Sequence, residues 1–161
     1  MKIIYILCLL LCMVNISFAS VPNNVYVVDD AEVLTETDKE YVKNLSDELE
    51  YYTKDKIKLV VVKYVPDNYT ASGYADKIWK QEIGTNNILV FASMHEPVIK
   101  ISCTNDKFSL KQREALINNF SDKYLQQENI PIALKNTVQE IVNELIERHL
   151  KDSNKMLRWW W

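Results

Sequence analysis

Four short apolar runs along the chain predict β-strands. They cover residues 25–28, 57–65, 88–93 and 98–103. The valine-rich run at 57–65 is apolar almost throughout, which is typical of a strand covered on both faces in an α/β sheet. Only residues 94–97 separate the last two runs. This short polar break predicts a β-hairpin.

Between and after these runs, apolar residues recur at steps of three and four positions, which predicts helices packed on a core. The first helix begins at Thr35, with Asp38 three residues later in a weak capping box, and ends at Lys54. The second runs from about Thr70 to Glu82, and two more follow, the last beginning near Ile130. The side chains expected to face the core are Val42, Leu45, Leu49, Tyr52, Tyr74, Ala75, Ile78, Trp79, Leu116, Phe120, Tyr124, Val138, Ile141, Val142, Leu145 and Ile146.

The order strand, helix, strand, helix, strand, strand, helix, helix predicts an α/β fold. We expect a three-layer α/β/α sandwich around a mixed sheet of about four strands, in which the last two strands form a hairpin. The domain organisation that follows is a signal peptide at 1–19, a linker at 20–24, one domain at 25–150 and a basic, tryptophan-rich tail at 151–161.

The first nineteen residues have the three parts of a signal peptide. Lys2 precedes an apolar core, and Ser17 and Ala19 place small residues at the positions that a signal peptidase reads. The apolar core is shorter than the roughly 20 residues of a membrane span. We therefore expect cleavage after Ala19 and export to a periplasm, cell envelope or extracellular space, with a retained anchor as the alternative.

Composition excludes several classes of function. A net charge of −3 without long basic runs does not fit a nucleic-acid binder. The only glycines are Gly73 and Gly84, too few for the phosphate-cradling loops of nucleotide-binding proteins. With two histidines and, after the signal peptide, Cys103 alone, neither a disulfide nor a zinc site is expected. We expect a monomeric domain in which Cys103 is a small buried residue and His95, at the hairpin tip, is solvated.

Polar residues gather at the loop ends of three predicted strands. If the first and last strands run the same way, their exit loops share one sheet edge, where carboxylate and amide oxygens could hold Ca²⁺. The alternative is that the same side chains only stabilise turns or a helix start. The residues of this predicted metal site are Asp29, Asp30, Asn86, Asn87, Asn105 and Asp106.

The chain ends in KMLRWWW, which places Arg158 before Trp159, Trp160 and Trp161. Aromatic and basic residues together favour the membrane–water interface. We expect these four residues to contact a membrane surface or a membrane protein.

The segment VYVVDDAEVLTETDKEYVKNLSDELE resembles the opening of the TPM domain family, in which a strand leads to an Asp, a small residue and a Val-Leu-Ser/Thr helix start. The resemblance continues through IKLVVVKYV, YADKIWKQEIG and NNILVFASMHEPVIKIS, and covers residues 25–149. It implies an α/β/α sandwich in an exported protein. Members include thylakoid-lumen proteins, bacterial envelope proteins and a receptor-accessory protein. Some are described as acid phosphatases, some bind calcium in an acidic cleft at the sheet edge, and many carry a transmembrane segment after the domain.

The family's site residues carry over only in part. Asp30 matches the acidic position after the first strand, and Gly84 matches the glycine before the acidic turn. Asn86 and Asn87 stand where the family often has Asp-Asn-Gly, so a carboxylate is missing. After the fourth strand, SCTNDKFSL lacks the usual glycine-rich loop.

We interpret this acidic site as eroded. The leading hypothesis is a non-catalytic cell-envelope or membrane-proximal accessory module with a weak divalent-cation site and no assigned catalytic residue. The alternative is a metal-assisted acid phosphatase acting on phosphomonoesters, with Asp30 and Asp106 at the metal.

Overall fold

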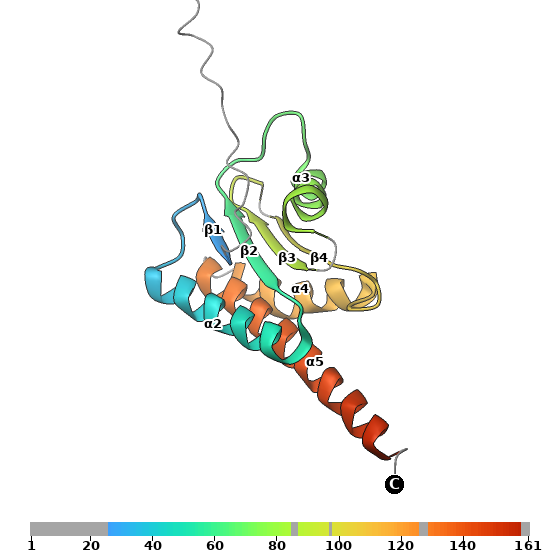
Figure 1. Ribbon diagram of the computed structural model, residues 1–161. Coiled ribbons are helices and arrows are strands. Elements are labelled where there is room, and N and C mark those ends of the chain that lie inside the picture. The colour runs from blue at the N-terminus through green and yellow to red at the C-terminus, as the bar shows by residue number, and fades with distance from the viewer. Residues whose placement is uncertain (1–25, 85–86, 97, 126–128, 159–161) are drawn as a thin grey trace, which may run out of the picture.

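A computed structural model describes residues 26–84, 87–96, 98–125 and 129–158 of the protein (Figure 1). In chain order the elements are β1 (Val27–Asp29), α2 (Glu36–Thr53), β2 (Ile57–Val62), α3 (Ala71–Ile78), the π-helix η1 (Trp79–Ile83), β3 (Ile88–Ser93), β4 (Val98–Ser102), α4 (Leu110–Leu125) and α5 (Ile130–Arg158).

The four strands form one mixed sheet in the order β1-β2-β3-β4. β1, β2 and β3 are parallel, because a helix returns the chain across the sheet between each pair. β4 is antiparallel to β3, because the short turn between them only reverses the chain. The predicted α/β fold and its terminal hairpin are confirmed.

Helices cover both faces of this sheet. α2, α4 and α5 lie on one face and α3 lies on the other (Figure 1). Every residue of β2 and β3 is buried, as expected for strands in the middle of a covered sheet. The larger core lies between the sheet and the three helices, and the smaller one lies under α3.

Most side chains expected in the core are there. Val42, Leu45 and Leu49 of α2 are buried, and so are the predicted positions of α5 as far as Leu145. Tyr52 is a correction, because it lies in the last turn of α2, 39 % exposed, with its ring packed edge-to-face on Tyr51 at 5.1 Å. The side chains of the predicted residues Phe120 and Tyr124 lie outside the described part of the structure.

The start of α2 is fixed by the predicted capping box. The Asp38 amide donates to Thr35 Oγ1 at 3.2 Å, and the Thr35 amide donates to the Asp38 carboxylate at 3.0 Å. Lys135 of α5 pairs with the same carboxylate. One side chain therefore caps α2 and ties it to α5.

The predicted second helix is divided into two parts. α3 ends at Ile78 and continues into the five-residue π-helix η1, which closes at Gly84 with φ +88°. Trp79 Nε1 donates to the Asn87 carbonyl at 2.9 Å, and Asn87 Nδ2 donates to the Ile83 carbonyl at 2.7 Å. These bonds connect the end of η1 to the start of β3.

α5 is one continuous helix that runs past the domain. The last buried residue among its described side chains is Leu145, and its C-terminal part projects away from the sheet and the other helices (Figure 1). In the described part of the chain, no helix is both long and apolar enough to cross a membrane.

Candidate functional site

The described residues of the predicted metal site lie at opposite ends of the sheet. Asp29 is the last residue of β1 and Asp30 follows it, at the end where β2 and β3 also finish. β4 runs the other way, so Asn105 and Asp106 follow it at the end of the sheet where β3 begins. Asn87 precedes β3 at this same end. The expectation that the first and last strands run the same way is therefore wrong. Asn86 lies outside the described residues.

Asp29 and Asp30 differ in what their side chains do. The Asp29 carboxylate accepts hydrogen bonds from the backbone amides of Val33, at 3.3 Å, and Leu34, at 2.8 Å. It therefore closes the turn that leads into α2. Asp30 is exposed, and its amide donates to the Val61 carbonyl at 2.9 Å, extending the pairing of β1 with β2.

The polar groups at the other end also have local partners. Asn105 Oδ1 accepts from the Arg113 guanidinium at 3.2 Å. Asp106 is exposed, and hydrogen bonding from Thr104 lowers the pKa of its carboxyl below the usual range. The amide of Asn87 points back to η1. These contacts are those of turn residues.

A single ion does not fit this arrangement, since its ligands would have to come from both ends of the strands. Among the described residues, no group of three or more His, Cys, Asp or Glu side chains is placed to hold a metal ion. Calcium binding stays a prediction.

The end of the sheet that carries Asp30 also has a shallow hollow of about 200 Å³, lined by Lys63, Tyr64, Met94 and His95. The His95 ring lies 5.2 Å from the Tyr64 ring, and Lys63 Nζ lies 5.7 Å from the same ring. These residues follow the carboxyl ends of β2 and β3, where ligands of open α/β sheets bind. The same rule could have indicated these residues from the sequence, since they follow directly after the apolar runs of β2 and β3. His95 is exposed, as expected.

A larger hollow of about 420 Å³ lies along β4. One wall comes from α3 and η1 and the other from α4, and the strand itself forms the floor. Sequence patterns do not predict this hollow, because its shape depends on how two helices on opposite faces of the sheet pack beside the same edge strand.

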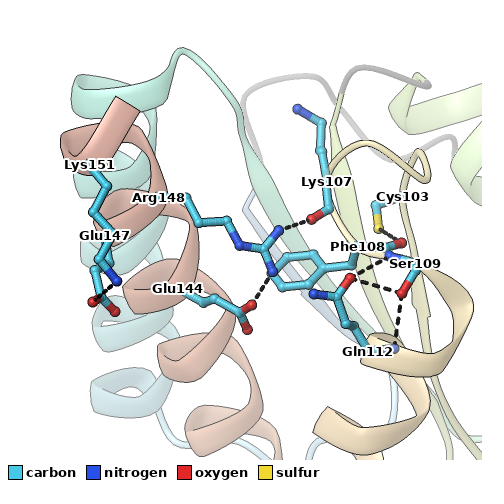
Figure 2. A network of polar contacts seen from close by, with 9 residues as sticks. All are labelled: Cys103, Lys107, Phe108, Ser109, Gln112, Glu144, Glu147, Arg148 and Lys151. Atoms are coloured by element: carbon cyan, nitrogen blue, oxygen red, sulfur yellow. Dashed lines mark hydrogen bonds and ion pairs between the residues drawn. The ribbon is translucent and has the colours of Figure 1, made fainter. Parts of the chain in front are cut away.

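The loop between β4 and α4 is held by α5 (Figure 2). Arg148 donates to the Lys107 carbonyl, pairs with Glu144, and stacks its guanidinium 4.8 Å from the centre of the buried Phe108 ring. Cys103 is buried beside Phe108, as expected of a small apolar residue, and burial raises the pKa of its thiol. The loop that carries Asn105 and Asp106 therefore starts and ends on core residues.

Ser109 and Gln112 begin α4 (Figure 2). Gln112 Oε1 accepts from both the amide and the hydroxyl of Ser109, each at 2.9 Å, and the Gln112 amide donates to Ser109 Oγ at 3.4 Å. This is a capping box, with Gln in the third helical position. It fixes the direction in which α4 passes β4.

Two solved structures have a similar fold. The N-terminal domain of a P. gingivalis protein matches with a TM-score of 0.68 and 13 % identity, over 80 % of this chain and 86 % of that one. The N-terminal domain of a Corynebacterium glutamicum protein matches with a TM-score of 0.63 and 15 % identity, over 78 % of this chain and 84 % of that one. At these identities the likeness concerns the fold alone. No curated protein matches the chain.

The family comparison agrees with the resemblance found in the sequence. The model of the TPM domain matches residues 27–144, which include all four strands and the buried residues of α5 as far as Val142. The chain belongs to the TPM domain family.

Proposed function

We propose that the protein is an exported, non-catalytic TPM domain that works as a membrane-proximal accessory module. In this proposal the C-terminal end of α5 contacts a membrane surface or a membrane protein. The observation that supports it is the projection of α5 beyond the domain.

The projecting part of α5 is long enough to act as a spacer. Arg148 contacts the loop after β4, and Arg158, the last residue of α5, lies ten positions further along the helix. At 1.5 Å per residue this part spans about 15 Å. Between Glu147 and Asn154 its side chains are mostly exposed and polar, so they add little to the core. The helix leads instead to the three C-terminal tryptophans, which lie outside the described residues.

The role of Asp29 supports the non-catalytic part of the proposal. A carboxylate that accepts two backbone amide bonds in a turn already has partners, and using it as a metal ligand would give up those bonds. Asp30 is exposed, but it lies at the opposite end of the strands from Asp106.

A vesicle experiment tests the membrane contact. The chain is purified from an exporting host and mixed with phosphatidylcholine vesicles, with and without an anionic lipid. A variant without residues 156–161 should partition about tenfold less or weaker still, because it loses the aromatic and basic groups. A second variant with Trp159, Trp160 and Trp161 changed to Ser keeps the charges and separates the two contributions. Unchanged partition of both variants would remove the anchoring role.

Export has its own measurement. The mass of the purified chain should correspond to cleavage after Ala19. A chain that keeps residues 1–19 and remains in the membrane after deletion of 156–161 would instead be held by its N-terminal segment.

The phosphatase alternative is tested with a generic phosphomonoester at acidic and neutral pH, with and without Ca²⁺ or Mg²⁺. We expect no turnover that depends on Asp30. Turnover lost in Asp30→Ala would overturn the non-catalytic proposal. A calcium titration followed by thermal unfolding reports metal binding separately, because a ligand of the native state raises the melting temperature.

A further inference from the structure

β4 is an edge strand with a groove along its open side. Within the described residues it pairs with β3 on one side only. The groove of about 420 Å³ follows the strand from Val98 to Ser102. α3 approaches β4 from one face of the sheet and α4 from the other (Figure 1). An open edge of this kind offers backbone amides and carbonyls to another extended chain.

Both walls of the groove are built on the same helical spacing. α4 contributes Leu110, Glu114 and Ile117, and the wall of α3 and η1 contributes Ser72, Asp76 and Trp79. Each set has steps of four and three residues, so each helical segment turns one face to the groove. On the α4 wall, Glu114 lies between the apolar side chains of Leu110 and Ile117. Leu110 is 63 % exposed.

The charged groups on the α3 side of the groove are matched. Lys100 pairs with Asp76 at 2.8 Å and donates to the Ser72 carbonyl and hydroxyl. On the α4 side, the Arg113 guanidinium donates to two neutral acceptors, the Cys103 carbonyl at 2.9 Å and Asn105 Oδ1, and among the described residues its Nε has no hydrogen-bond partner.

Glu114 is different from these groups. It is exposed, it lines the groove, and within the described part of the chain it has no salt-bridge or hydrogen-bond partner. The groove therefore presents an exposed, unpaired carboxylate between two apolar side chains, whereas the neighbouring Arg113 is bound to the loop after β4.

We propose that the groove binds an extended peptide segment of a partner protein, which adds to β4 as a fifth strand. Alternate residues of an added strand face opposite sides. The residues on the α4 side would be apolar opposite Leu110 and Ile117, with a Lys or Arg between them opposite Glu114. The residues on the other side would be small and polar, facing Ser72 and Asp76. The proposal rests on the accessory role proposed above, because it supplies the surface by which such a module holds its partner.

A second copy of the chain fits this edge less well. Antiparallel pairing of two β4 strands about their centres would place Lys100 opposite Lys100, and like charges directly opposite destabilise a strand pair. Lysine on an edge strand is also a common device against pairing of identical edges. A peptide without that lysine has no such conflict.

The test uses the full chain, labelled for NMR, and the synthetic peptide Ser-Val-Thr-Lys-Thr-Val-Ser. Addition of the peptide should shift the amide signals of residues 98–102. A peptide with Glu in place of Lys should bind about fivefold more weakly or worse, as expected for loss of one exposed charge pair. Glu114→Lys should reverse the order of the two peptides. Glu48→Lys, an equal charge change on the exposed face of α2, should leave it unchanged.

The outcomes separate this inference from the anchoring role. Peptide shifts that persist after deletion of residues 156–161 support the groove whatever the vesicle result. Absence of shifts at 98–102 at about millimolar peptide, or shifts insensitive to the sign of residue 114, would overturn it. Concentration-dependent shifts of β4 without any peptide would mean that the edge is used by a second copy, and would also overturn it.

Discussion

At the scale of single residues, the two adjacent aspartates at the end of β1 have different environments. Asp29 is half-buried and bonds two backbone amides, whereas Asp30 points to solvent. The sequence shows only a pair of acids at a strand end, which is equally typical of a ligand site and of a turn. The distinction depends on which carboxylate faces the amides of the following turn.

Replacing these two acids in turn gives a matched comparison. Asp29→Ala removes the acceptor for the amides of Val33 and Leu34, and should lower the free energy of unfolding by about 2 kcal/mol. Asp30→Ala removes an exposed side chain and should change the free energy of unfolding by less than about 0.5 kcal/mol. Urea unfolding at neutral pH measures both. Equal effects of the two substitutions would contradict the assignment of the turn to Asp29.

Asp38 makes the stability depend on pH. Bonds from Lys135 and from the hydroxyl and amide of Thr35 lower the pKa of the Asp38 carboxyl to about 2, from 3.8. A lowered pKa in the folded state means that the ionised form stabilises the fold, so this contribution is complete above about pH 4 and is lost as the pH falls toward 2. Asp38→Asn should cost about 1–2 kcal/mol at pH 7, and the difference from the unchanged protein should shrink between pH 4 and 2.

The measurement is urea unfolding at a series of pH values. Glu36→Gln, an exposed change in the same turn, is the control and should follow the unchanged protein at every pH. A difference between Asp38→Asn and the unchanged protein that stays constant down to pH 2 would show that the carboxylate charge is not what stabilises α2.

At the scale of elements, the apolar patterns predicted the strands and helices well. The predicted metal site, in contrast, required β1 and β4 to run in the same direction, and they do not. The run at 88–93 is the strand β3 without change, and the capping box at Thr35 begins α2 as predicted. Two helical crossovers make β1, β2 and β3 parallel, and the hairpin then reverses β4. Both features were predicted from the sequence. Taken together, these two features already place Asp106 and Asp30 at opposite ends of the sheet.

The π-helix could not be predicted from apolar spacing, because its few residues continue the pattern of α3. Its end depends on Gly84, whose amide donates to the Trp79 carbonyl at 2.8 Å. Gly84 combines φ +88° with ψ 146°, a region that residues with a Cβ rarely adopt. The glycine itself is the one feature of the sequence that indicates where this helical segment ends.

Gly84→Ala should therefore lower the free energy of unfolding by about 1–3 kcal/mol, through strain at this φ. Gly73→Ala is the matched control. Gly73 lies in the first turn of α3, where alanine is the better helix former, and its added Cβ would lie 3.2 Å from Thr70 Oγ1. These effects oppose each other, so we expect the free energy of unfolding of Gly73→Ala to differ from that of the unchanged protein by less than about 1 kcal/mol. Thermal unfolding of both variants measures these effects. A larger loss of stability for Gly73→Ala than for Gly84→Ala would contradict the assignment of backbone strain to Gly84.

At the scale of the whole molecule, helices are distributed unevenly over the sheet. In the part of the chain that the structure describes, α2, α4 and α5 bury one face, and α3 with η1 covers the other. The groove along β4 is therefore bounded by elements of both layers. α5 connects these features. It packs on α2 and α4, holds the loop after β4, and then leaves the domain. The two proposed contacts, at the groove and at the C-terminal end, thus lie on different parts of one framework.

This division of α5 predicts how truncation acts. A chain ending at Asp152 keeps Ile141, Val142 and Leu145 in the core and keeps Arg148 at Lys107, so its free energy of unfolding should stay within about 0.5 kcal/mol of the full chain. A chain ending at Glu140 loses those three buried aliphatic side chains. Each such loss costs about 2–4 kcal/mol, and their sum matches the whole stability of a typical domain, so this chain should not fold. Circular dichroism during urea unfolding distinguishes the two. Marked destabilisation by removal of residues 153–161 alone would mean that the projecting part of α5 packs on the domain, and the spacer role would then fail.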